Sequence, residues 1–390
     1  MDWEKIRKDF PITESVVYFQ SAAMSPIPEV VFQSLVTEYR KLRDFGDVFW
    51  DKDLKTSDIV RSMCGDILNT DGANMTLVAN TSLAMSLIAL ALKENISDRF
   101  SIVSMMDEFP SSTIPFEYLG ISMIYVNPQS ARYPVESILD RIEEDTIGVL
   151  TSYVQYNTGF RQDLIRLGKE LKKRDLLFIV NATQAFPFFP IDVEEMQIDV
   201  MAASLHKWGF TGHLGSLFYT SPSFRKRYKA VLAGWLSVLP LECGMIQTEK
   251  NVPLKVHESA DQYNFGTYNL QTLMAFKTTL EYLLSIGLKN CRNRILDLTN
   301  YLVERLRSLP LNLVTPVGSI EERSAIVSFS LGREDRACVK YLEREKIYVS
   351  FRDNSIRVAL NIFNNRDEID RLIRALNLFL SKYARKSNDL

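Results

Sequence analysis

Between about residues 76 and 220, short apolar runs alternate with amphipathic stretches. The runs are rich in Val, Ile and Leu and have the length of strands, whereas the stretches between them place apolar side chains at helical spacing. Strands separated by helices indicate a mostly parallel sheet with helices on both faces. The expected strands are Thr76–Ala79, Ser101–Met105, Met123–Val126, Ile147–Ser152, Leu176–Val180, Val200–Ala203 and Ser216–Tyr219, and the expected helices include Leu83–Lys93, Pro134–Glu143 and Asp163–Arg174.

A different pattern follows this region. A long helical stretch, Asn269–Leu309, is interrupted at Gly287. A smaller mixed segment then predicts strands at Ala325–Leu331, Tyr348–Phe351 and Ser355–Leu360, with helices at Ala337–Glu345 and Arg366–Tyr383. Because a chain of 390 residues is too long for one ordinary core, we expect an α/β protein with three parts. These are an N-terminal segment (1–20), a large domain (21–285) with a mostly parallel sheet flanked by helices, and a smaller α+β C-terminal domain (286–390).

Composition narrows the classes of function. The formal net charge is −2 and the pI is about 6.1, so the chain has no basic character that would favour nucleic acid. The N-terminus lacks the basic-then-apolar pattern of a signal peptide, and no apolar run approaches the ~18 residues of a membrane span. The four cysteines lie far apart, and three histidines are few for a histidine-rich metal centre. We expect a cytoplasmic protein that binds no metal, no nucleic acid and no membrane.

The first candidate for chemistry is Lys207, in the sequence SLHKWG (204–209) directly after an expected buried strand. Ligands of mostly parallel sheets bind beyond the carboxyl ends of the strands. Burial of an unpaired ammonium is costly, so desolvation lowers the pKa of such a lysine, and its free amine forms an imine with a cofactor aldehyde. Taken alone, the same residues also fit a surface lysine in a glycine-containing turn.

Two further strand ends carry polar residues. The strand Leu176–Val180 is followed by NATQ (181–184), and the strand Thr76–Ala79 is followed by NTS (80–82) and a helix. Hydroxyl groups and free N–H groups at the start of a helix form an anion site, although a simple N-cap has the same local sequence. The residues directly after these strands are therefore the candidates for a ligand site.

Taken together and in this order, the motifs resemble the fold type I pyridoxal 5′-phosphate (PLP) enzymes of the class V aminotransferase family. That family also contains cysteine desulfurases, kynureninase and isopenicillin N epimerase-like proteins. The resemblance runs from YFQSAA (18–23) to RVALNIFNN (357–365), which is nearly the whole chain. It implies the PLP-dependent transferase fold of type I and PLP as the cofactor.

The resemblance assigns roles to individual residues. Lys207 matches the catalytic lysine, which forms a Schiff base with PLP and later moves protons. Thr81, Ser82, Ser204 and His206 match positions that hold the cofactor phosphate.

Other matches surround the cofactor ring and the substrate. Phe109 matches the residue stacked on the pyridine ring, and Gln184 matches the amide that contacts the phenolic oxygen. Thr267 matches a residue that reaches the phosphate of a neighbouring subunit, which implies a homodimer. Arg357 matches the arginine that binds a substrate α-carboxylate as a bidentate pair, with a surface salt bridge as the alternative. The loop 153–161 matches the cofactor-side loop, and which of its side chains points inward is left open.

Two departures from the family pattern bear on the reaction. Asn181 stands where the family has an aspartate that pairs with the protonated pyridine nitrogen, and a neutral amide supplies no charge there. The alternative is that water or another acid, such as Asp192, supplies it. Desulfurases also need a mobile cysteine ahead of the terminal arginine, but residues 347–355 contain no thiol. Cys338 lies in an expected amphipathic helix and is interpreted as a core residue.

We therefore expect a PLP enzyme that acts on an amino acid or related amine. Aminotransferase-type chemistry is the first expectation on family grounds. A lyase, an epimerase or a cyclising elimination is the alternative, because Asn181 weakens the electron-withdrawing power of the ring. A non-catalytic PLP-fold protein with a binding or regulatory role is a third hypothesis, against which the retained Lys207 and Arg357 argue.

Overall fold

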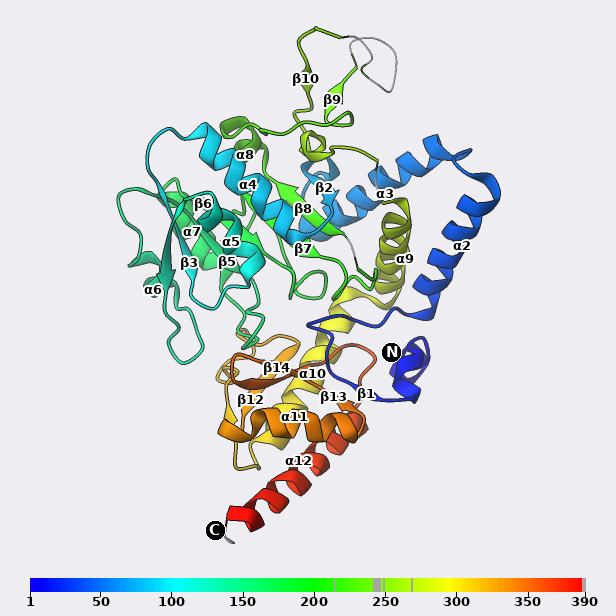
Figure 1. Cartoon of the computed structure of the whole chain (residues 1–390), viewed down its shortest axis with the longest axis vertical. Helices are drawn as coiled ribbons and strands as arrows, with labels where there is room; N and C mark the ends of the chain where they lie inside the picture. The colour runs from blue at the N-terminus through cyan, green and yellow to red at the C-terminus, as the bar shows by residue number, and fades with distance from the viewer. Residues whose placement is uncertain (214, 241–246, 248–249, 268, 388–390) are drawn as a thin grey trace.

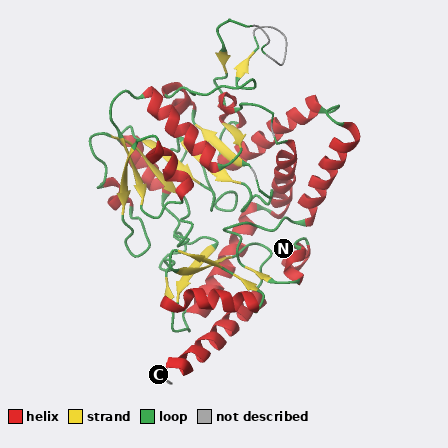
Figure 2. Ribbon diagram, in the orientation of Figure 1, coloured by secondary structure: helices red, strands yellow, loops and turns green. Residues whose placement is uncertain are grey.

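The computed structural model describes residues 1–213, 215–240, 247, 250–267 and 269–387. At its centre lies a seven-stranded sheet of order β2-β8-β7-β6-β5-β3-β4 (Figures 1 and 2). Strand β8 runs antiparallel to both of its neighbours, and the other pairs are parallel. The strands are β2 (Met75–Val78), β3 (Ser101–Met105), β4 (Ser122–Val126), β5 (Thr146–Ser152), β6 (Leu177–Asn181), β7 (Val200–Ser204) and β8 (Ser216–Thr220). The expected mostly parallel sheet is confirmed.

Helices cover both faces of this sheet (Figure 1). Successive residues of a strand point to opposite faces, so Ile179 packs in the core under one helical layer and Phe178 in the core under the other. One layer consists of α4 (Thr81–Asn95), α5 (Pro110–Tyr118) and α8 (Pro222–Arg227). The other includes α3 (Trp50–Leu68), α6 (Val135–Leu139), α7 (Leu164–Lys173) and α9 (Leu270–Ile286).

A smaller sheet of order β11-β12-β15-β14 forms a second layer with its own helices. Its pairs are all antiparallel. The strands are β11 (Asn312–Leu313), β12 (Ile326–Ser330), β14 (Ser350–Arg352) and β15 (Ser355–Ala359), and the helices are α10 (Leu288–Leu306), α11 (Asp335–Arg344) and α12 (Arg366–Ser387). Helix α10 begins after Gly287, which has a φ of +88°, and connects the two cores. Its Cys291 is buried in the large core, whereas its Leu302 is buried in the small one.

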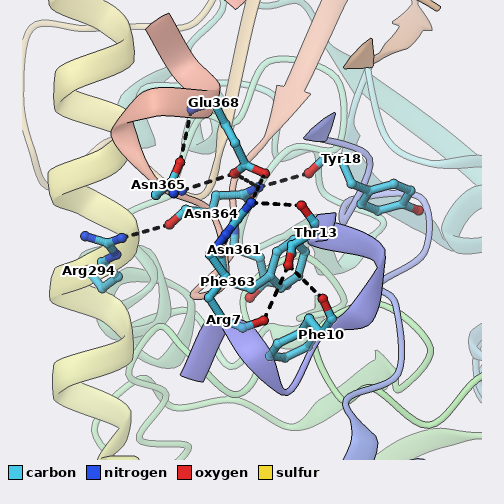
Figure 3. Close-up of polar contacts among 10 residues, drawn as sticks. All are labelled: Arg7, Phe10, Thr13, Tyr18, Arg294, Asn361, Phe363, Asn364, Asn365 and Glu368. Atoms are coloured by element: carbon cyan, nitrogen blue, oxygen red, sulfur yellow. Dashed lines mark hydrogen bonds and ion pairs between the residues drawn. The ribbon is translucent and has the colours of Figure 1, made fainter. Parts of the chain in front are cut away.

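The N-terminal residues pack on the small sheet side of the molecule. After α1 (Trp3–Lys8) and the 3-10 helix η1 (Pro11–Glu14), β1 (Val17–Tyr18) pairs in parallel with β13 (Ile347–Tyr348). Figure 3 shows the polar contacts of this junction. The Arg7 guanidinium donates to the Phe363 carbonyl oxygen (2.7 Å) and to Glu368 Oε1 (2.9 Å). Glu368 Oε2 accepts from Asn364 Nδ2 (2.9 Å), so one carboxylate joins the first helix to the last.

Two segments extend from the body of the large unit. Helix α2 (Glu29–Phe45) packs along α9, and β9 (Val238–Leu239) pairs with β10 (Lys255–Val256) in a short antiparallel ribbon (Figure 1). Three more 3-10 helices are η2 (Gly72–Asn74), η3 (Ala260–Tyr263) and η4 (Gly332–Glu334). Within the described residues, no helix combines the length and the apolar character that a membrane crossing needs.

Candidate functional site

A cavity of about 310 Å³ lies at the carboxyl ends of the parallel strands of the large sheet, where they face the small sheet. Strand β8 is antiparallel to both β2 and β7, so β2 and β7 end at the same edge. The structure brings nine of the ten predicted site residues to this cavity. They are Thr81, Ser82, Phe109, Asn181, Gln184, Ser204, His206, Lys207 and Arg357.

One end of the cavity is built to hold an anion. The N-cap of α4 is Asn80, whose Oδ1 accepts from the Leu83 N–H (2.9 Å). Because Asn80 does the capping, the hydroxyls of Thr81 and Ser82 are not used for it. The Thr81 hydroxyl lies 2.6 Å from the Ser204 hydroxyl at the end of β7. Free N–H groups, hydroxyls and the positive end of the helix dipole thus meet at one point.

Lys207 is the candidate nucleophile. It is partly buried, and its Nζ lies 5.4 Å from the centroid of the Phe109 ring. Burial and, to a smaller extent, the positive charges of Arg357 and Arg352 together lower the pKa of this amine to about 7. A large fraction of the amine is therefore neutral and nucleophilic at neutral pH.

His206 precedes Lys207 and also lines the cavity. Burial lowers the pKa of its imidazole to about 4, with smaller contributions from Lys207 and His213. The ring centroids of His206 and His213 are 5.9 Å apart. A neutral imidazole next to the hydroxyl groups can donate one hydrogen bond to an anion.

The loop after β5 contributes Tyr156, which settles the open question of its inward-facing side chain. The Tyr156 ring packs edge-on against Phe109, with centroids 5.2 Å apart. Its hydroxyl donates to Asp353 Oδ2 (2.7 Å), and this bond together with burial raises the pKa of Tyr156. In the same loop Gly159 has a φ of +74°, and a Cβ there would lie 2.3 Å from the Ile326 carbonyl oxygen of β12. The loop is thus pressed against the small sheet, and its tyrosine bridges the two units.

Asn181 ends strand β6, and its amide is already engaged. Its Oδ1 accepts from the Thr183 N–H (3.0 Å), and its Nδ2 donates to Ser112 Oγ (2.9 Å). Asp192, the acid considered as an alternative source of negative charge for the pyridine nitrogen, does not line the cavity. Its carboxylate instead accepts from Asn69 Nδ2 and from the Glu195 N–H.

A different carboxylate lies behind the cavity wall. The buried Glu108 accepts from the Ser152 hydroxyl (2.6 Å), from the Ser152 N–H and from Gln155 Nε2 (3.0 Å). Ser152 lines the cavity and is the register partner of Asn181 on the neighbouring strand. Burial raises the pKa of Glu108, whereas the three donors favour the ionised form. An acidic group is therefore one hydrogen bond away from Ser152, the residue that lies beside Asn181 in the sheet.

The amide of Gln184 is fixed in place on both sides. Its Nε2 donates to the Ala22 carbonyl oxygen (3.0 Å), and its Oε1 accepts from the Trp208 indole (3.1 Å). Each Nε2 group carries two hydrogens, so one N–H remains to contact a ligand in the cavity.

Arg357 enters the cavity from strand β15 of the small sheet. Its side chain is almost fully buried, and burial lowers its pKa to about 10. Nη1 donates to the Tyr156 carbonyl oxygen (2.6 Å), while the buried Nε has no hydrogen-bond partner. No ion pair of Arg357 occurs among the described residues, which removes the salt-bridge interpretation. A buried guanidinium with an unused donor is a site for an anion.

Several cavity residues were not predicted from the sequence. They are Ala22, Ala23, Asn80, Ser111, Ser152, Tyr156, Thr183 and Arg352. Of these, Arg352 had a signal in the sequence, because Asp353 and Asn354 are turn-forming residues between two expected strands. In the structure both have positive φ (44° and 56°), and this two-residue turn places Arg352 and Arg357 on the same face of the β14–β15 hairpin.

The tenth predicted residue, Thr267, is not part of this cavity. It is exposed and lines a separate cavity of about 260 Å³ with Gly266, Leu83 and Tyr263. Within one chain, the structure therefore does not bring Thr267 together with Thr81 and Lys207.

Comparisons with known proteins were made on the sequence and on the fold. The sequence model of the family described as "Aminotransferase class-V" matches residues 17–372. A probable cysteine desulfurase from Pyrococcus abyssi is 23% identical over 96% of this chain and 96% of that protein. The apo structure of a cysteine desulfurase from Thermococcus onnurineus NA1 superposes with a TM-score of 0.87 at 19% identity, covering 97% of this chain and 98% of that one.

A second solved structure is the cystine C-S lyase C-DES in complex with its product, cysteine persulfide. It has a TM-score of 0.85 at 18% identity and covers 94% of this chain and 98% of that chain. The structural likenesses establish the type I fold, and the family match spans most of the chain. The chain therefore belongs to the class V aminotransferase family of PLP-dependent enzymes.

Proposed function

We propose that the cavity binds PLP, that the cofactor attaches to Lys207 Nζ, and that the bound cofactor processes an amino acid. The observation that carries this proposal is the position of a desolvated lysine, with a pKa of about 7, in the same cavity as the anion site of α4 and the unpaired Arg357. The phosphate and the aldehyde of PLP and the carboxylate of an amino acid thus each have a chemically suitable group in this cavity.

The cavity residues would bind different parts of the cofactor and the substrate. Thr81, Ser204 and His206 would hold the phosphate, and the Phe109 ring would cover one face of the pyridine and exclude water from it. When bound, PLP supplies the electron-withdrawing group that weakens bonds at the substrate α-carbon. Arg357 would hold the α-carboxylate, and the Lys207 amine would take and return the proton at the α-carbon.

Aminotransferase-type chemistry is the first reaction that we propose. A lyase-type elimination is the second, and one observation favours it. The Asn181 amide is neutral and is engaged by Thr183 and Ser112, so it leaves the pyridine nitrogen without an anionic partner. A carbanion at the α-carbon is then less stable, which favours rapid loss of a β-leaving group.

Cysteine desulfurase activity, for which the relatives are named, is not proposed. No cysteine lines the cavity in the part of the chain that the structure describes. Cys64, Cys291 and Cys338 are buried, Cys338 within the small core as expected, and burial raises the pKa of each thiol. Cys243 lies outside the described residues.

We further propose a cytoplasmic homodimer. Apolar side chains on α2 are exposed in the single chain, among them Phe32 (49%), Tyr39 (60%) and Phe45 (56%). Exposed apolar surface of this kind marks an interface. By the family resemblance, Thr267, which does not line the cavity of Lys207 in its own chain, would contact the phosphate bound by the second copy.

Peptide mapping after borohydride reduction tests the proposed function. The protein incubated with PLP should carry a pyridoxyl group on Lys207, and the Lys207→Ala variant should carry none. With a panel of amino acids, transamination should yield keto acid and the amino form of the cofactor without free ammonia, whereas elimination should yield ammonia together with keto acid and the released β-group. A pyridoxyl group on another lysine would contradict the proposal, and so would a protein that does not bind PLP.

A further inference from the structure

The β14–β15 hairpin presents two arginines to the cavity. Ser350 is the register partner of Arg357, and Arg352 is the register partner of Ser355. Side chains two residues apart on a strand share a face, so Arg352 and Arg357 are diagonal neighbours on one face of the hairpin. Such diagonal positions lie roughly 7–8 Å apart at the backbone, which is within the reach of long side chains, so both guanidinium groups can contact one small ligand. Both side chains line the cavity.

The cavity has an excess of positive charge. Its lining includes Lys207, Arg352 and Arg357, and no Asp or Glu is among the described residues that line it. Neither arginine forms an ion pair among those residues, and Arg352 donates only to the Phe351 carbonyl oxygen (2.8 Å). The carboxylate nearest in sequence, Asp353, is engaged by the Tyr156 hydroxyl instead.

The anions of the proposed function do not use both arginines. The phosphate has its own site at α4, on the large sheet, with the hydroxyls of Thr81 and Ser204. A single α-carboxylate needs one bidentate guanidinium, and Arg357 provides it. Arg352 is then a second guanidinium, on the same face of the hairpin, without an assigned anion.

We propose that the substrate is an amino acid with a second acidic group on its side chain, and that Arg352 binds this group while Arg357 binds the α-carboxylate. This inference rests on the proposed function and deepens it to a substrate class, the amino dicarboxylic acids and amino acids with a comparable side-chain anion. Arg352 is exposed at the mouth of the cavity, whereas Arg357 is buried deep in it. The side chain of the substrate therefore points outward, toward the turn of the hairpin.

Ligand binding to the cofactor-free protein tests the arginine pair without any reaction. Dicarboxylates from malonate to adipate are compared with the monocarboxylates of equal chain length, with inorganic phosphate present to fill the α4 site. At least one dicarboxylate should bind tenfold or more tightly than its monocarboxylate partner. Arg352→Gln should abolish this difference, and Arg352→Lys should retain part of it. Arg333→Gln, a change at an exposed arginine that does not line the cavity, should leave it intact. Equal binding of the two acid classes, or a preference that survives Arg352→Gln, would overturn the inference.

The loaded enzyme gives the second test. Aspartate, glutamate and 2-aminoadipate are compared with asparagine and glutamine, and kcat/KM is measured for each. The best acidic substrate should exceed its neutral amide partner by at least tenfold, and Arg352→Gln should lower kcat/KM for the acid at least tenfold more than for the amide. If PLP attaches to Lys207 but neutral amino acids react as well as acidic ones, the substrate class is wrong and the proposed function stands. If PLP does not attach to Lys207, the proposed function fails first.

Discussion

The lowered pKa of Lys207 gives a prediction with a measurable size. An ordinary lysine has a pKa of 10.5, whereas burial and two arginines lower that of Lys207 to about 7. At pH 7 about half of the Lys207 amines are then neutral, compared with about one in three thousand for an ordinary lysine. Because only the neutral amine attacks an aldehyde, Lys207 should react with PLP on the order of a thousandfold faster at this pH.

The rate of PLP capture by the cofactor-free protein measures this pKa. The rate should rise with pH, pass its midpoint near pH 7 and then level off, since the neutral fraction is complete above the pKa. Nα-acetyl-lysine amide, followed under the same conditions, corrects for the ionisation of PLP itself and should still be rising at pH values where the protein has levelled off. Borohydride reduction and peptide mapping confirm that the captured cofactor is on Lys207.

Removal of the neighbouring charges should move the midpoint upward. Each neighbouring guanidinium disfavours the charged form of Lys207, so its removal should raise the pKa of the amine. We expect Arg357→Gln to raise the midpoint more than Arg352→Gln, because solvent screens the charge of the exposed Arg352. Burial is the larger cause, so the midpoint should stay below 10.5 in both variants. A midpoint near 10 in the native protein, or one that neither variant moves, would refute this electrostatic account.

Three further substitutions test the proposed carboxylate site, the proposed subunit contact and the position beside the pyridine nitrogen. Arg357→Ala removes a charge-assisted bidentate contact worth about 2–4 kcal/mol. The KM should therefore rise strongly for amino acids and little for simple amines. An equal rise in KM for both classes would indicate that Arg357 has a structural role. Thr267→Ala should speed PLP loss from a protein that sediments as a dimer; a monomeric protein with firmly bound PLP would contradict the subunit arrangement. Asn181→Asp places a carboxylate by the pyridine nitrogen and should raise keto acid formation relative to ammonia, with a changed cofactor spectrum. An unchanged product ratio and spectrum would indicate that Glu108, through Ser152, already supplies the charge.

Much of the site was predictable because its residues follow buried strands. The apolar runs placed the seven strands of the large sheet to within one residue of their observed ends, since a strand covered on both faces must be apolar along its length. The carboxyl ends of such strands meet at one edge, so Lys207, Asn181 and Thr81 were expected near one another from their position after a strand. The expectation that the chain is not a desulfurase rests on the absence of a thiol from residues 347–355, which the sequence alone shows.

Other features depended on contacts between distant segments. Strand β8 is antiparallel although its apolar pattern resembles that of its neighbours, because strand direction is set by the chain's path and leaves no mark on hydrophobicity. In the sequence, Glu108 is an ordinary acidic residue in a loop. Only the folded chain shows that its carboxylate accepts a hydrogen bond from Ser152, 44 positions away, which lies beside Asn181 in the sheet.

Arg352 and Arg357 share a face because they lie on one hairpin, but their position in the same cavity as Lys207 depended on how the small sheet packs on the large one. The sequence by itself determined the fold class and placed Lys207 and Thr81 directly after buried strands, because these features depend on local pattern and on the order of strands along the chain. The tertiary structure alone decided which charges share the cavity, because a cavity is enclosed by side chains from separate elements. The charge of the cavity lining follows from the strand register and from how those elements pack together, and no short stretch of sequence specifies either.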